Sequence, residues 1–233
     1  MKILGIIAEY NPFHNGHAYH INLSKYKSNC DAVVIAMSGN FVQRGEPAII
    51  DKWRRAESAI YGGADLVVEI PLPFACQNAE MFAKAAFQVL EKIPIDTLSF
   101  GCENYNTDIL YKIADLQLNR RKEYNNSIKK YLNLGYSFPE AINNSILLLL
   151  GTNEANIIST PNNLLALEYI KNIIQSKLNI DILPIIRIGA NYNDNAITNS
   201  FSSASSIRKA MLNNEFTLIK NTLPKRSFDF LFE

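Results

Sequence analysis

The sequence is poor in cysteine, histidine and tryptophan, with three, three and one in 233 residues. The cysteines, Cys30, Cys76 and Cys102, lie far apart and form no CxxC pair, which argues against a structural zinc site and against a disulfide framework. An odd number of isolated cysteines is typical of proteins in a reducing compartment. We therefore expect a cytoplasmic protein.

Long apolar runs and an excess of charge of one sign are also lacking. Apolar runs such as residues 146–150 are far shorter than the roughly 20 residues of a membrane-spanning helix. The short run before Glu9 has no cleavage pattern of a signal peptide. The chain has 23 basic and 22 acidic residues, a balance that neither favours nor excludes nucleic acid. We expect no contact with a membrane.

Apolar residues are abundant enough for a packed core, at 48% of the chain. Nearly continuous apolar runs predict buried parallel strands at residues 3–8, 32–37, 65–70, 96–100 and 181–188. Helical patterns lie between them, at residues 17–27, 51–61 with Asp51 as the cap, and 78–92, and one helical face holds Leu164, Leu167, Ile170 and Ile174. The alternation predicts an α/β fold, a Rossmann-like doubly wound parallel sheet of about five strands.

All three histidines lie in one stretch, "EYNPFHNGHAYH", residues 9–20. It follows the first predicted strand, and ligands of open α/β sheets bind beyond the carboxyl ends of strands. Gly16 allows a close backbone approach, and the free N–H groups of a helix start attract an anion. His14 and His17 can donate to phosphate oxygens and stabilise charge on a leaving phosphate.

Two other interpretations of this stretch are open. The spacing His14-x-x-His17-x-x-His20 can hold a metal, although Pro12 and Gly16 favour a turn and no carboxylate cluster follows. The histidines can also simply cap a helix and pack. Three imidazoles in seven residues beside a strand end favour the phosphate-binding interpretation.

The HxGH pattern resembles the motif of HIGH-type nucleotidyltransferases and aminoacyl-tRNA synthetases. Those enzymes carry a second motif of serines and a basic residue at a helix start, and "SSASSIRKAM", residues 202–211, fits it. Ser205, Ser206 and Arg208 would then bind the β- and γ-phosphates of ATP, with Arg208 offering a bidentate charge. The plain alternative is a serine-capped helix with Ser203 or Ser205 as the N-cap.

A closer resemblance covers residues 1 to about 211. The segments "EYNPFHNGHAYH", "MSGNFVQRGEPA", "GADLVVEIPLPFA", "FGCEN", "TPNNLLALEY" and "RIGANYND" occur in this order. Together they resemble the tRNA(Met) cytidine acetate ligase family. The resemblance implies activation of acetate by ATP to acetyl-adenylate, with release of pyrophosphate. It implies transfer of the acetyl group to N4 of the wobble cytidine of elongator tRNA(Met), without acetyl-CoA.

The resemblance also implies a site. Its ATP contacts match Ile7, Ala8, Glu9, Tyr10, Asn11, Pro12, Phe13, His14, Asn15, Gly16, His17, Ala18, Tyr19, His20, Gly101, one of Asn162 and Asn163, Arg187 and Ile188. The catalytic set would be His14, His17 and Arg208, with Mg²⁺ on the phosphates and no metal ligand from protein side chains.

Several of these residues have plain alternatives of their own. Gly101 follows the fourth strand and can lie flat against an adenine or a ribose. Asn163 can be a helix cap. Arg187, in an apolar run, can be buried against a ligand anion or equally against an internal carboxylate.

Basic residues follow the second predicted strand, in the segment "SGNFVQRGEPAIIDKWRRAESA". We expect tRNA backbone or acetyl-adenylate contacts from Gln43, Arg44, Lys52, Arg54 and Arg55, although such side chains are usually just solvated. A second basic cluster, at residues 120–122 and 129–130, is better explained as a solvated helix face.

We expect residues 1–215 to form the catalytic domain, with a helical insertion at about 104–151. Residues 216–233 would begin a C-terminal region that is truncated, because the family members are longer. A small-molecule nucleotidyltransferase is the alternative function, but it leaves "MSGNFVQRGEPA" unexplained. A truncated, non-catalytic nucleotide- or RNA-binding module is another. The sequence carries no signal for an oligomeric state.

Overall fold

The computed structural model describes the chain except for residues 104–105, 153–156, 159, 188–199 and 233. The chain divides into two compact units. The sheet unit comprises Met1–Gly101 and Ile180–Glu233, and the helical unit comprises Cys102–Asn179. In the described part of the chain, no helix is long and apolar enough to cross a membrane.

The sheet has five strands in the order β3-β2-β1-β4-β5. They are β1 (Ile3–Ala8), β2 (Ala32–Ser38), β3 (Leu66–Ile70), β4 (Thr97–Cys102) and β5 (Asp181–Ile186). The pairs β1–β2, β1–β4 and β2–β3 are parallel. The predicted α/β fold and all five predicted strands are confirmed. The last strand ends at Ile186, earlier than predicted, and Ile188 lies outside the described residues.

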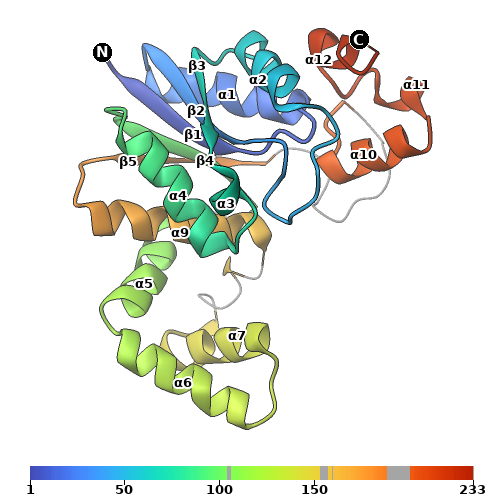
Figure 1. Ribbon diagram of the computed structural model, residues 1–233. Helices are drawn as coiled ribbons and strands as arrows, with labels where there is room; N and C mark the ends of the chain where they lie inside the picture. Colours follow the sequence, from blue (N-terminus) through green and yellow to red (C-terminus); the bar gives the residue numbers. More distant parts are fainter. Residues whose placement is uncertain (104–105, 153–156, 159, 188–199, 233) are drawn as a thin grey trace. The chain divides into compact units, whose positions relative to one another are not determined.

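Helices cover both faces of the sheet (Figure 1). On one face, Leu4 and Ile6 of β1 pack with Ile21 of α1 (Asn15–Ser28) and Ala59 of α2 (Lys52–Tyr61). On the other face, Gly5 lies against α4 (Ala79–Glu91), because a Cβ at Gly5 would come within 3.2 Å of Leu90 Cδ1. The short helix α3 (Leu72–Ala75) follows β3. The sheet is therefore doubly wound, as the continuous apolar strands predicted.

Side-chain caps fix the helix starts on the sheet unit. The Asp51 carboxylate accepts from the N–H groups of Trp53 and Arg54 at 2.9 and 3.1 Å, so the predicted cap of α2 is confirmed. Asn78 Oδ1 accepts from Met81 N–H at 2.9 Å and begins α4. Such caps satisfy N–H groups that a helix cannot pair internally.

The helical unit contains α5 (Thr107–Leu118), α6 (Arg121–Asn133), α7 (Phe138–Leu149) and α9 (Pro161–Ser176). It runs beyond the predicted insertion at 104–151, because α9 packs with α5. Leu167 and Ile170 of the predicted apolar face are buried. Leu164 is 38% exposed and Ile174 is half-buried, while Ala166 and Ile173 are buried, so the buried face is shifted from the predicted one.

Three C-terminal helices belong to the sheet unit: α10 (Ala204–Leu212), α11 (Phe216–Ile219) and α12 (Lys225–Asp229). Ile207 and Ala210 of α10 form one apolar cluster with Ile219 and Leu223. The predicted domain boundary at residue 215 falls inside this cluster. The segment after it is thus packed as part of the unit that holds the sheet.

Candidate functional site

The loop after β1 is anchored by two aromatic rings. Tyr10 and Phe13 are buried, and their rings meet edge to face with centroids 4.9 Å apart. Tyr10 adopts a left-handed backbone, with φ of 51°. Gly62 leaves room for Phe13, since a Cβ there would collide with the Phe13 ring. These rings anchor the loop in the core. The histidines follow directly, and His14 begins α1 beyond the carboxyl end of β1.

His14 and His17 form a stacked pair, with ring centroids 3.7 Å apart. His14 Nδ1 accepts from Gly16 N–H at 3.0 Å, and His14 N–H donates to His17 Nδ1 at 3.3 Å. This is a capping box made of imidazoles. Because each Nδ1 accepts a hydrogen bond, each neutral ring carries its proton on Nε2.

Both rings are neutral near pH 7. Burial lowers the pKa of His14 to about 3, and the positive charge of Arg187 adds to the effect. Burial also holds the pKa of His17 well below its ordinary value, with further lowering by His14 and Arg187. The pair therefore offers two neutral Nε2–H donors. Capping, the plain alternative, and donation coexist here, because they use different ring nitrogens.

The start of α1 differs from the expectation of free N–H groups. Asn15 N–H donates to Thr222 O at 2.9 Å, Gly16 N–H to His14 Nδ1, and His17 N–H to His14 O at 2.9 Å. The first-turn donors are thus used within the protein. Gly16 leaves room for the His14 ring, because a Cβ at residue 16 would lie only 2.9 Å from His14 Cε1.

His20 is fastened to the sheet by a serine pair. His20 Nε2 lies 2.9 Å from Ser99 Oγ, and Ser99 Oγ lies 2.8 Å from Ser24 Oγ. Burial lowers the pKa of His20 to about 4. Among the described residues, no group of three or more His, Cys, Asp or Glu side chains is arranged to hold a metal.

The serine–arginine motif reaches the loop after β1. Arg208 Nη1 donates to Asn11 O at 2.9 Å, across 197 residues of sequence. Ser203 is the N-cap of α10, since its Oγ accepts from Ser206 N–H at 3.0 Å. Ser206 Oγ donates back to Ser203 O at 2.8 Å, and Ser205 is half-buried. The structure thus brings Arg208 to the site and uses the Ser206 hydroxyl within the cap.

Arg187 and Gly101 lie together at the ends of β5 and β4. A Cβ at Gly101 would lie 3.5 Å from Arg187 Cγ, so the glycine leaves space for the arginine stem. Arg187 is exposed, which corrects the expectation of a buried guanidinium. Its charge lowers the pKa of His14, His17 and His20. It is therefore close enough to the histidine cluster to act on it electrostatically.

The two predicted asparagines lie in the helical unit, in the first turn of α9. Asn163 is fully buried, its Oδ1 accepts from Glu103 N–H at 3.2 Å, and its Nδ2 donates to Ile157 O at 2.7 Å. It is not the helix cap, because α9 begins at Pro161 after Thr160. The Glu103 carboxylate accepts from Asn162 Nδ2 and from Thr160 Oγ1. Sequence reasoning missed Glu103, although "FGCEN" contains it.

Arg55 is not a surface residue, which corrects its predicted role as a tRNA or adenylate contact. It is 1% exposed. Its guanidinium donates to Ile50 O and Ser38 O at 3.1 Å each, and to the backbone oxygens of Glu9 and Gly39. Arg55 therefore ties together the ends of β1 and β2.

The other residues of the predicted tRNA set differ in their contacts and in their exposure. Gln43 Nε2 donates to Gln77 O at 2.8 Å. Lys52 pairs with Glu69 at 2.6 Å, and Arg54 lies 3.7 Å from Asp51. Arg44 is exposed. Three cations thus stay near the surface after the second strand.

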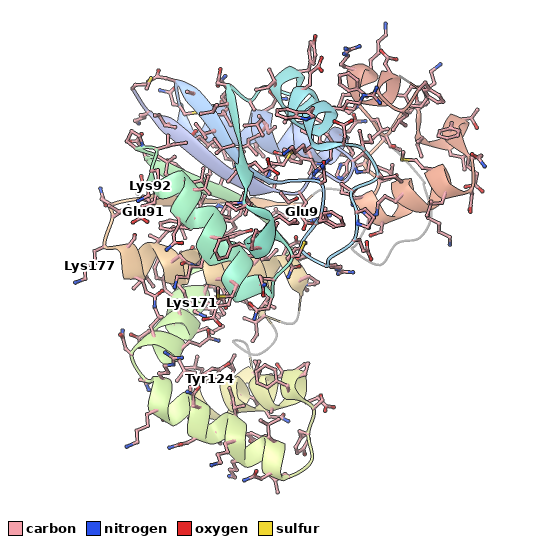
Figure 2. The ribbon with its side chains drawn as sticks, viewed as in Figure 1. Glu9, Glu91, Lys92, Tyr124, Lys171 and Lys177 are labelled. Atoms are coloured by element: carbon pink, nitrogen blue, oxygen red, sulfur yellow. The ribbon has the colours of Figure 1, made fainter. Side chains whose placement is uncertain are left out.

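Glu9 joins the two loops at the carboxyl edge of the sheet. Its Oε1 accepts from Gln43 N–H at 2.6 Å. Burial raises the pKa of Glu9, while the Gln43 hydrogen bond and the charges of Arg208 and Arg44 oppose that shift. Figure 2 labels Glu9 just beyond β1, beside the loop that follows β2. The carboxyl group is therefore held by the segments that carry the site.

Comparisons with known proteins identify the family of the whole chain. A family model described as HIGH Nucleotidyl Transferase matches residues 1–233. The tRNA(Met) cytidine acetate ligase of Caldicellulosiruptor bescii is 43% identical over 234 residues, covering 100% of this chain and 57% of that protein. The protein of the same name from Acetivibrio thermocellus is 45% identical over 240 residues, covering 100% of this chain and 58% of its own.

Solved structures give the same result. The crystal structure of apo Thermotoga maritima TmcAL matches all of this chain and 56% of its own, with a TM-score of 0.93 and 37% identity. The same protein bound with alpha-thio ATP matches with a TM-score of 0.89 and 36% identity, over 100% of this chain and 55% of that one. This chain thus spans little more than half the length of the relatives that it matches.

Proposed function

The chain belongs to the HIGH nucleotidyl transferase family, and we propose that it activates acetate with ATP and acetylates N4 of the wobble cytidine of elongator tRNA(Met). One observation carries the proposal: the loop after β1 leads into the neutral, stacked His14–His17 pair and also accepts a hydrogen bond from Arg208 at Asn11 O. The names of its relatives and the ATP analogue bound to TmcAL support the choice of substrates.

In the proposed first step, an acetate oxygen attacks the α-phosphorus of ATP. An O–P bond forms, the bond from the α-phosphorus to the bridging oxygen breaks, and pyrophosphate leaves with the electron pair. The Nε2–H groups of His14 and His17 would donate to phosphate oxygens on which charge grows. Preorganised donors of this kind stabilise a transition state strongly in a site shielded from water.

The cations complete the phosphate-binding set. Arg208 and Arg187 would neutralise the triphosphate and the leaving pyrophosphate, in the role that arginines commonly serve. Acetate is already ionised near neutral pH, so this step needs positioning rather than a base. Mg²⁺ enters only as the usual partner of the phosphates of ATP.

The proposed nucleotide contacts are narrower than the full predicted set. Tyr10 and Phe13 are buried in the core, so their contribution would be to shape the loop. The amide of Asn163 is occupied on both sides within the helical unit. The side-chain amide of Asn162 donates to Glu103 within the same unit.

In the proposed second step, cytidine N4 attacks the acetyl carbonyl of the adenylate and AMP leaves. The N–C bond forms, the bond from the carbonyl carbon to the AMP oxygen breaks, and N4 gives up one proton to the departing AMP phosphate or to solvent. Arg44, Lys52 and Arg54 would contact the tRNA backbone, because cations beside a strand end suit phosphate contacts that carry no sequence information.

Acetate-dependent exchange of labelled pyrophosphate into ATP, without tRNA, tests the first step. We expect exchange that requires acetate and is lost in His17→Ala. Exchange that ignores acetate but responds to another acid or nucleotide would favour a small-molecule nucleotidyltransferase. ATP binding without exchange would favour a non-catalytic binding module. Acetylation of tRNA(Met) transcripts by the same preparation tests the second step.

A further inference from the structure

Asn15, the variable position of the HxGH motif, makes three hydrogen bonds to remote backbone. Its N–H donates to Thr222 O at 2.9 Å. Its Nδ2 donates to Asn221 O at 2.8 Å and to Ser200 O at 3.1 Å. The partners of its side chain are 206 and 185 residues away in sequence. Asn15 thus links the start of α1 to two segments near the C-terminus.

The side chain has no donor left for a nucleotide. An amide nitrogen carries two hydrogens, and the two carbonyl oxygens take both. Sequence reasoning placed Asn15 among the ATP contacts, but its amide donors point to protein. Two amide hydrogens that are both donated within the protein indicate positioning rather than donation to a ligand.

The two segments held by Asn15 both lead to Arg208. Ser200 lies just before Ser203, the cap of the helix that carries Arg208. Residues 221–222 follow α11, which shares an apolar cluster with α10. Thr222 is buried, and its Oγ1 donates to Ile219 O at 2.8 Å. The carbonyl that meets Asn15 N–H is therefore fixed.

A second contact joins α10 to the loop after β1. Arg208 Nη1 donates to Asn11 O, four residues before Asn15. The loop after β1 is thus held to α10 at two points, by Asn15 on one side and by Arg208 on the other. His14 lies between them and next to Asn15 in the chain.

We propose that Asn15 is a positioning residue that sets the distance between the His14–His17 pair and Arg208 by holding residues 200–222 against the start of α1. The inference rests on the proposed function of that site. Misplacement of reacting groups by about 1 Å can cost roughly a hundredfold in rate, so a small shift of α10 has a large effect.

The test compares Asn15→Ala and Asn15→Asp with Asn22→Ala. Asn22 is the matched control, because it lies on the same helix and its Nδ2 donates to Ala18 O at 2.9 Å, within α1. The readouts are kcat and KM in pyrophosphate exchange, and hydrogen–deuterium exchange of residues 200–222. The second readout reports the link directly and needs no activity.

We expect Asn15→Ala to lower kcat about tenfold to a hundredfold with a change in the KM for acetate below about twofold. Asn15→Asp should lower it more, because a carboxylate would face two carbonyl oxygens. In both variants, hydrogen–deuterium exchange should be faster at residues 200–222 and unchanged in the strands. Asn22→Ala should match the parent in both readouts.

Two results would overturn the proposal. One is normal kcat in Asn15→Ala. The other is a lower kcat with unchanged hydrogen exchange at residues 200–222, which would make Asn15 a direct ligand contact. If the parent shows no pyrophosphate exchange, the proposed function fails separately. Hydrogen exchange then decides alone, since unchanged protection of residues 200–222 in Asn15→Ala would exclude the link itself.

Discussion

His14 and His17 hold each other's orientation: the backbone N–H of His14 donates to His17 Nδ1 at 3.3 Å, and the two rings stack at 3.7 Å. His14 Nδ1 is in turn held by Gly16 N–H at 3.0 Å. The helix start therefore fixes which nitrogen of each ring bears the proton. The same contacts that cap α1 prepare the Nε2–H donors of the site.

This arrangement separates capping from chemistry in a single variant. In His14→Asn, the asparagine side chain can still cap α1, because Asn is among the best N-cap residues. The Nε2–H donor is lost. We expect a fall in pyrophosphate exchange of about a hundredfold to a thousandfold, typical of removing one donor to developing charge.

Urea denaturation provides the control for His14→Asn. Stability should change by less than about 1 kcal/mol, because the cap is retained. Exchange at the parent rate would remove His14 from the catalytic set. A large loss of stability would instead make its role mainly structural.

The lowered pKa values of the histidines make stability depend on pH. Burial lowers the pKa of His14 to about 3 and of His20 to about 4. An unfolded imidazole titrates near about pH 6.5, so between these values the unfolded chain binds more protons than the folded one. Stability then rises with pH, and it is lost as the pH falls below about 6.5.

Urea unfolding at about pH 7 and about pH 5 measures this loss. Each histidine contributes at most about 1.4 kcal/mol per pH unit. Glu9 acts in the opposite direction, because burial raises its pKa and the folded state keeps its proton to higher pH. We expect a lower midpoint at pH 5 and a smaller drop in His14→Asn. A higher midpoint at pH 5 would contradict the neutral state of these histidines in the folded protein.

Arg55 should matter for stability. Arg55→Met leaves the backbone oxygens of Ser38, Gly39 and Glu9 without their guanidinium donor. Each buried acceptor left unpaired costs about 1–3 kcal/mol, partly offset by removal of a buried charge. We expect a net loss of about 2–4 kcal/mol in urea unfolding. The stability of Arg55→Lys should lie between that of the parent and that of Arg55→Met, because an ammonium group has fewer donors than a guanidinium.

A cost below about 0.5 kcal/mol for Arg55→Met would be the value of a surface residue and would contradict its burial. Arg54→Met is the matched comparison. It is the neighbouring arginine on α2, where it donates one hydrogen bond to Phe230 O at 3.4 Å and forms a surface ion pair with Asp51 at 3.7 Å. Such pairs contribute at most about 1 kcal/mol.

Arg44 tests the proposed tRNA contact. It is exposed in the loop after β2. Arg44→Ala should leave the stability within about 0.5 kcal/mol of the parent. If Arg44 contacts a phosphate, the slope of log affinity for tRNA(Met) against log salt should fall by about one. Filter binding at several salt concentrations measures it, and an unchanged slope would move the tRNA surface elsewhere.

Local sequence was sufficient to predict the framework. The five apolar runs became five strands, because a continuous apolar segment has to be covered on both faces wherever it lies. Asp51 caps α2 and Ser203 caps α10, because a cap depends on residues two or three positions away. The HxGH stretch lies at a strand end because it directly follows the first apolar run in the sequence.

Tertiary structure decided the roles of the polar residues. Arg55 is buried because the ends of β1 and β2 present backbone oxygens around it, and Arg187 is exposed although it follows an apolar strand. Asn15 serves carbonyls near residue 221, and Asn163 serves Glu103. A polar side chain satisfies its hydrogen bonds with whatever the fold brings near. Those partners are tens to hundreds of residues away, so no local pattern contains them.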